Sequence, residues 1–122
     1  MKKYNKGIRW ERELLEFLNY KGFSCIRSAS SGGYYFPVDV VAIKKSLVLA
    51  FECKSWKTKP SLSKKDFEKF KKWCEKAGAW GFLAWRKNKD EWLFLPLKNI
   101  EKNEYQDDKW IKMEKLLDTF IF

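Results

Sequence analysis

Three charged residues in the first half of the chain have types and a spacing suited to chemistry on a phosphate ester. Asp39 stands at the start of one apolar run, and Glu52 and Lys54 stand at the end of the next, with twelve residues between Asp39 and Glu52. Residues two apart on a β-strand point to the same face, so Glu52 and Lys54 share one. If the two runs pair as a hairpin, Asp39 is brought onto that face as well. The spacing therefore predicts a site with two carboxylates and one ammonium group.

Two carboxylates at the buried ends of strands are unfavourable unless something neutralises them. A hard divalent cation does so, and Mg²⁺ in particular is bound by one or two carboxylates together with waters and phosphate oxygens. Such an ion activates water and stabilises the charge that develops on a phosphate under attack. We therefore predict a Mg²⁺ site, with Mn²⁺ able to substitute and no small-molecule cofactor. Lys54 would position the attacking water or the scissile phosphate.

Glu11 is a further candidate, in a helix expected over residues 7–21. It stands three, four and seven residues before the leucines of the apolar stripe, so its side chain is expected to face the sheet. Glu13 and Glu16 fall toward the outer faces of this helix, and we expect ordinary solvated charges there.

Each of these residues taken alone also has a structural explanation. Asp39 could cap the start of a strand, and Glu52 could form an exposed ion pair with Lys54. Glu11 could neutralise a neighbouring basic residue. The combination of paired strands with an inward glutamate upstream favours a nuclease over these separate explanations.

The charge balance and the lack of histidine narrow the chemistry. The 122 residues include 26 Lys and Arg, 16 Asp and Glu and no histidine, for a net charge of +10. Imidazole catalysis and His-ligated zinc are therefore excluded. Residues 1–60 contain 12 basic and 5 acidic side chains, a net +7, whereas residues 61–122 have a net +3. A polyanion such as nucleic acid is the expected partner of the first half.

The cysteines and the hydropathy indicate a cytoplasmic protein with no membrane partner. Cys25, Cys53 and Cys74 are far apart and form no CxxC pair, which argues against a disulfide framework or a zinc site. The N-terminal residues lack the apolar core of a signal peptide. The longest apolar run, residues 47–51, is far too short to cross a bilayer.

The elements that must position the candidate site predict a single α/β domain over residues 1–122. The order α-β-β-β-α-β-β-α would be buried by a central mixed five-stranded sheet flanked by helices. Ser63 and Asp66 indicate a capping box that begins the second helix, and Gly78 ends it. The other elements are helices over residues 7–21 and 108–119 and strands over residues 23–28, 38–43, 47–53, 80–85 and 92–95.

An excess of aromatic residues in the second half suggests a partner. The two strands expected at 80–85 and 92–95 present more apolar surface than the last helix can cover. The side chains concerned are Trp80, Phe82, Trp92 and Phe94 at one set of alternating positions and Leu83 and Trp85 at the other. A homodimer would bury this surface and would place two active sites on one DNA. The alternative is that these side chains form the core.

In its motifs the sequence resembles the archaeal Holliday junction resolvases of the PD-(D/E)xK nuclease superfamily. The residues that support the resemblance are Lys6-Gly7, Glu11-Arg12-Glu13-Leu14, Gly22-Phe23, Arg27, Ser31-Gly32, Pro37-Val38-Asp39 and Glu52-Cys53-Lys54-Ser55. The D…ExK part is generic to many nucleases, whereas the K-G…E-R-E-L start, Arg27 and the Ser-Gly pair are specific to the resolvases. The sequence departs from the family at Val38, which separates the proline from Asp39, and in the aromatic loop 33–36.

The resemblance implies a structure-selective endodeoxyribonuclease that makes paired, metal-dependent cuts in four-way DNA junctions as a homodimer. The roles it implies are metal ligation by Asp39, Glu52, Glu11 and the Cys53 carbonyl, catalysis by Lys54, a hydroxyl near the scissile phosphate from Ser31, and DNA backbone contacts by Arg12 and Arg27. Lys6, Arg9 and Lys57 flank the site and are expected to contact further phosphates. Two alternatives stay open, namely a related nuclease acting on duplex or flap DNA and a DNA-binding module without catalysis.

Overall fold

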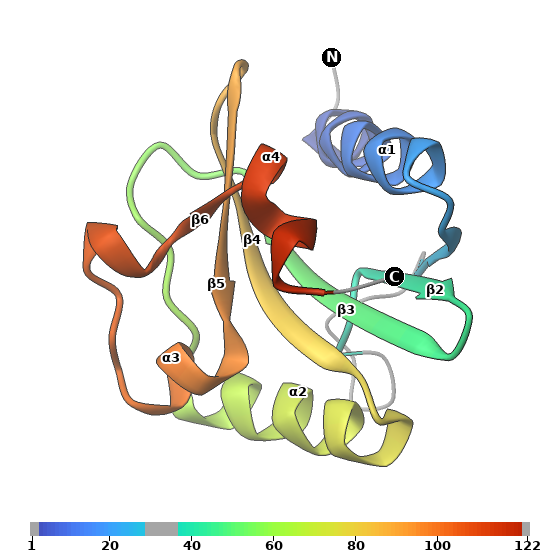
Figure 1. Ribbon diagram of the computed structural model, residues 1–122. Helices are drawn as coiled ribbons and strands as arrows, with labels where there is room; N and C mark the ends of the chain where they lie inside the picture. Colours follow the sequence, from blue (N-terminus) through green and yellow to red (C-terminus); the bar gives the residue numbers. More distant parts are fainter. Residues whose placement is uncertain (1–2, 29–36, 121–122) are drawn as a thin grey trace.

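Six strands form one mixed sheet in the described part of the chain (Figure 1). The computed structural model describes residues 3–28 and 37–120, apart from the side chains of residues 3–9 and 119. The strands lie side by side in chain order, as β1 (Ser24–Arg27), β2 (Val40–Lys44), β3 (Leu47–Lys54), β4 (Trp80–Asn88), β5 (Glu91–Pro96) and β6 (Ile111–Lys112). Neighbours are antiparallel except for the parallel pair β3 and β4. The α/β class with a mixed sheet is confirmed, but the expected number of five strands was wrong.

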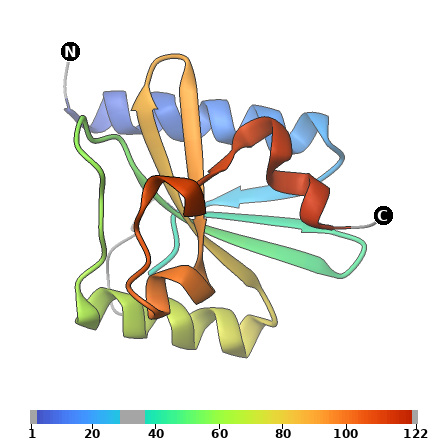
Figure 2. The same cartoon turned by 60° about the vertical axis from the view of Figure 1, so that its left-hand side comes forward.

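Two long helices cover opposite faces of this sheet (Figures 1 and 2). Helix α1 (Lys3–Tyr20) packs Leu18 onto the face that presents Leu49 and Phe51, and helix α2 (Lys64–Ala77) packs Phe70 onto the face of Ala50. These three neighbouring residues of β3 are fully buried, so this strand is covered on both faces. The strand that ends in the candidate site is therefore the centre of the core.

The boundaries of α2 follow the signals in the sequence. The Ser63 hydroxyl accepts a hydrogen bond from the Asp66 N–H at 3.1 Å, which caps the first turn. Gly78 ends the helix in the left-handed conformation, with φ of 66°. Both predictions for this helix are confirmed.

The C-terminal region corrects the prediction of a closing helix over residues 108–119. A short helix α3 (Leu97–Glu101) follows β5, and the remainder divides into η1 (Asp107–Lys109), β6, α4 (Met113–Leu116) and η2 (Leu117–Thr119). Trp110 is buried, donates from Nε1 to the Tyr105 carbonyl at 2.9 Å, and packs against Trp85 with ring centroids 5.3 Å apart. Ile111 then pairs with Phe94 of β5. Tertiary packing and strand pairing thus override the local helical pattern.

The aromatic residues that suggested a partner lie mostly in the core of the chain itself. Of the six residues named for that surface, all but Trp80 are buried, and Trp80 is 57% exposed. The aromatic argument for a dimer was therefore wrong, and the alternative of a core is confirmed. None of the described helices is long and apolar enough to span a membrane.

Candidate nuclease site

Asp39 is fixed where the strands β1, β2 and β3 meet. Its backbone N–H donates to the Phe51 carbonyl and its carbonyl accepts from the Ser28 N–H, each at 2.9 Å. The carboxylate oxygen Oδ2 accepts a hydrogen bond from the Cys53 N–H at 2.6 Å. With 5% of its surface exposed, Asp39 is held by the backbone on two sides and tied to the end of β3. The hairpin brings Asp39 to the Glu52 end of that strand, as the sequence predicts.

Glu52 stands beside Asp39 in an environment that disfavours a second negative charge. Burial raises the pKa of Glu52 to about 8, and the Asp39 charge and a hydrogen bond between the two carboxyl groups act in the same direction. Lys54 opposes this rise, since its Nζ lies 3.7 Å from Glu52 Oε1. At neutral pH and without a cation, Glu52 therefore holds a proton. Such a site is poised to exchange that proton for a metal ion.

Lys54 is placed by the segment that follows β3. Its Nζ lies 5.4 Å from the centroid of the Trp56 ring, and the Trp56 carbonyl accepts a hydrogen bond from Trp85 Nε1 at 2.7 Å. This contact ties the exit of β3 to β4. The ammonium group is thereby kept next to the carboxylates while about a quarter of the side chain, 27%, remains exposed.

Glu11 lies next to the carboxylate pair and is held by an arginine. Its Oε1 accepts from Arg27 Nε at 2.7 Å. Burial raises the pKa of Glu11, as does the Asp39 charge, whereas Arg27 lowers it. Across residues 3–28 and 37–120, no group of three or more acidic, cysteine or histidine side chains is gathered closely enough to hold a metal ion. Glu11 therefore faces the site as predicted, but its immediate partner is Arg27.

Helix α2 contributes two residues that sequence reasoning missed. A cavity of about 90 Å³ is lined by Glu52, Lys54, Pro37 and the α2 residues Asp66 and Lys69. The Lys69 Nζ lies 3.7 Å from Asp66 Oδ1. Asp66 was recognised as part of the capping box, but only the packing of α2 on the sheet shows that it also borders the carboxylates.

The remaining predicted residues are placed as follows. Arg12 and Lys57 are exposed, in accordance with a role on the DNA. Lys6 and Arg9 lie on α1 but their side chains are outside the described residues, as are Ser31 and the loop 33–36. The Cys53 thiol is buried, and burial raises its pKa well above the usual range. Cys53 therefore contacts the site through its backbone, whose N–H donates to Asp39.

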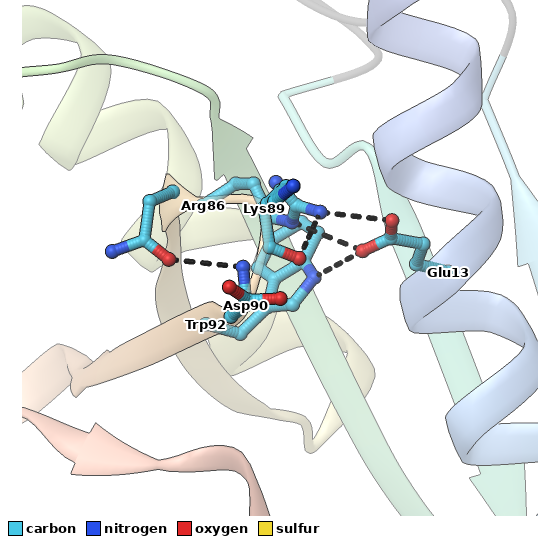
Figure 3. A network of polar contacts seen from close by, with 6 residues as sticks. Glu13, Arg86, Lys89, Asp90 and Trp92 are labelled. Carbon is cyan, nitrogen blue, oxygen red and sulfur yellow. Dashed lines mark hydrogen bonds and ion pairs between the residues drawn. The ribbon is translucent and has the colours of Figure 1, made fainter.

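The Glu13 side chain is 41% exposed, but it is not the ordinary solvated charge that the sequence predicts, because it has specific partners. It accepts hydrogen bonds from Arg86 and from the Trp92 indole (Figure 3). Nothing in the local sequence indicates this partner, because Arg86 is 73 residues away.

The donors at this site fit a hard divalent cation. Asp39 and Glu52 offer carboxylate oxygens side by side, and a cation there would offset the burial and the Asp39 charge that raise the pKa of Glu52. Mg²⁺ is commonly held by one or two carboxylates, with waters and substrate phosphates completing its shell. A two-carboxylate site without thiolate or imidazole ligands matches that preference.

A family model for archaeal Holliday junction resolvases matches residues 2–120. The chain belongs to this family. It is 46% identical over 113 residues to the crossover junction endodeoxyribonuclease Hjc of Methanocaldococcus jannaschii, covering 90% of this chain and 81% of that relative. The protein of the same name from Archaeoglobus fulgidus is 36% identical over 102 residues, covering 82% and 75%.

A solved structure of a family member has the same fold. The structure of Archaeoglobus fulgidus Hjc, described as a Holliday junction resolvase from an archaeal hyperthermophile, matches with a TM-score of 0.68 and 31% identity, covering 87% of this chain and 86% of that chain. These matches confirm the resemblance and the nuclease class predicted from the sequence. An archaeal Holliday junction resolvase, like other nucleases with this carboxylate chemistry, is expected to need a divalent metal.

Proposed function

We propose that this chain is a cytoplasmic, Mg²⁺-dependent endodeoxyribonuclease that resolves four-way DNA junctions, with Mn²⁺ able to replace Mg²⁺. The observation that supports it best is the pairing of Asp39 with Glu52 beside Lys54, in a chain whose relatives are named crossover junction endodeoxyribonucleases. The carboxylate pair supports metal-dependent cleavage of a phosphate ester, and the family assignment supports four-way DNA junctions as the substrate.

Each residue of the site has a proposed role. Asp39, Glu52 and the Cys53 carbonyl would hold the metal ion, and Glu11 would complete their acidic surroundings. A bound divalent cation supplies positive charge that neutralises the phosphate and lowers the pKa of water. Lys54 orients the attacking water or holds the scissile phosphate.

Positive side chains around the site would bind the phosphate backbone. Arg12 and Lys57 are exposed. Lys6 and Arg9 on α1 and Arg27 on β1 belong to the same N-terminal half, which has a net charge of +7. Ser31 would place its hydroxyl near the scissile phosphate. Because such contacts identify no bases, the enzyme is expected to recognise the shape of the junction.

A competition experiment separates this proposal from a nuclease of duplex DNA. We expect a labelled four-way junction to stay mostly bound and to be cut in the presence of about a 100-fold excess of unlabelled linear duplex, since specific complexes are about 10³-fold or more tighter than non-specific ones. Gel mobility shift and cleavage in Mg²⁺ measure the two quantities. Displacement of the junction by an equal amount of duplex would contradict junction selectivity.

Paired cuts across one junction require two active sites, so we also propose a homodimer. Among the described residues, Tyr20, Ile26, Ile43, Trp56 and Trp80 remain 40% exposed or more, which provides apolar surface for a partner. Sedimentation at micromolar concentration is expected to give a species of twice the 14.7 kDa chain mass. A monomer at that concentration, with or without junction DNA, would contradict the dimer.

A further inference from the structure

Arg86 of β4 connects the sheet to α1 through a set of polar contacts (Figure 3). It donates from Nε to Glu13 Oε1 at 3.0 Å and from Nη2 to Glu13 Oε2 at 2.9 Å. Nη2 also donates to the Lys89 carbonyl at 2.7 Å, and Trp92 Nε1 donates to Glu13 Oε1 at 3.1 Å. The guanidinium carbon lies 4.1 Å from the centroid of the Trp10 ring. We call these five residues the α1 clamp.

The α1 clamp fixes both the orientation of Glu13 and its distance from β4. The Arg86 side chain is only 3% exposed, and a buried guanidinium without its carboxylate is strongly unfavourable. A planar guanidinium that donates two parallel hydrogen bonds accepts a carboxylate in one arrangement. Glu13 is therefore held in a single position relative to β4, and α1 is held with it.

The α1 clamp borders the proposed catalytic residues directly. Trp10 and Trp92 line a cavity of about 50 Å³ together with Glu11, Cys53, Lys54 and Ser55. On the β1 side, Arg27 holds Glu11 itself at 2.7 Å. Two arginines thus hold α1, Arg27 on β1 through Glu11 and Arg86 on β4 through Glu13. Residues two apart on a helix are about 200° apart around its axis, so these two contacts together oppose rotation of α1.

We propose that Arg86 is a positioning residue, which sets the rotation of α1 through Glu13 and thereby the place of the Glu11 carboxylate beside Asp39 and Glu52. The inference rests on the proposed nuclease function and adds a residue to its site. We assign Arg86 no contact with the DNA or the metal. Its contribution is transmitted through the helix.

Binding of Mn²⁺ to the full chain without DNA tests this role, with free Mn²⁺ followed by electron paramagnetic resonance. We expect Arg86→Met to weaken Mn²⁺ binding about 10-fold, as is usual for residues that orient metal-site side chains, and to slow cleavage as well. Arg86→Lys keeps the positive charge without the planar group, and its affinity should fall between those of Arg86→Met and the wild type. If Arg86→Met fails to fold, Arg86→Lys decides the question.

Two comparisons separate positioning from a general loss of stability. Ile100→Ala truncates a buried side chain of α3, away from α1, and should lower the melting temperature while leaving Mn²⁺ affinity unchanged. In a Glu11→Gln background, Arg86→Met should cause no further loss of Mn²⁺ affinity, because its effect passes through Glu11. The proposal is overturned if the Arg86 variants bind Mn²⁺ like the wild type, or if the full 10-fold loss persists without the Glu11 charge. A wild type that binds Mn²⁺ but cuts no DNA would instead contradict the proposed function.

Discussion

Glu52→Gln is expected to abolish junction cleavage, by about 10³-fold or more, while junction binding stays equal or becomes tighter. The substitution removes one of two carboxylates that would hold the metal, and loss of metal stabilisation amounts to several kcal/mol in the transition state. The shape of the side chain is nearly unchanged, so the fold and the DNA surface should persist. Without metal, binding should be equal at neutral pH, where Glu52 holds a proton. It can strengthen where Glu52 is ionised, because the substitution then removes a negative charge next to the phosphates.

Single-turnover cleavage and gel mobility shift on the same junction measure both expectations. Glu75→Gln on α2 is the matched control, since it makes the same chemical change at an exposed residue outside the site. Cleavage by Glu52→Gln at the wild-type rate would contradict the assigned site. A wild type that binds junctions and cuts none in Mg²⁺ or Mn²⁺ would indicate a DNA-binding module without catalysis.

The carboxylate pair was predictable because it depends on short-range rules. The alternation of side chains along a strand places Glu52 and Lys54 on one face, and the short turn of Lys45 and Ser46 between β2 and β3 brings Asp39 to them. The resulting register pairs Val40 with Phe51, which sets Asp39 next to the end of β3. The limits of α2 were equally predictable, since its capping residues act within one turn.

The parts that escaped prediction depend on contacts between distant segments. Asp66 and Lys69 reach the site only because α2 packs across the parallel pair of strands, and Arg86 meets Glu13 only because α1 crosses the other face. The C-terminal region shows the same limit, since the burial of Trp110 replaces a predicted helix by a strand and short turns. The local sequence gives no sign of these partners.

Metal-free wild-type protein is expected to lose stability as the pH rises from about 5 to 8. Glu52 has an ordinary pKa of 4.5 in the unfolded chain and about 8 in the folded one, so between these values the folded state holds a proton that the unfolded state has released. Stability then falls with increasing pH by about 1.4 kcal/mol per pH unit for this group, and the dependence ends below 4.5 and above 8. The pKa of Glu11 is also raised, which adds to the same trend at the acidic end.

Mg²⁺ should remove most of this dependence, because it binds the folded state and replaces the proton on Glu52. In the same pH window its affinity is expected to rise about tenfold per unit, since each ion must displace one proton. Urea denaturation at pH 5, 6, 7 and 8, with EDTA or with Mg²⁺, measures the free energy of unfolding, and calorimetry measures the affinity. Glu52→Gln in EDTA should be nearly independent of pH apart from the share of Glu11, and more stable than the wild type at pH 8. If the free energy of unfolding of Glu52→Gln fell with pH as steeply as that of the wild type, Glu52 would not be the group that titrates. The cation would then bind at another group.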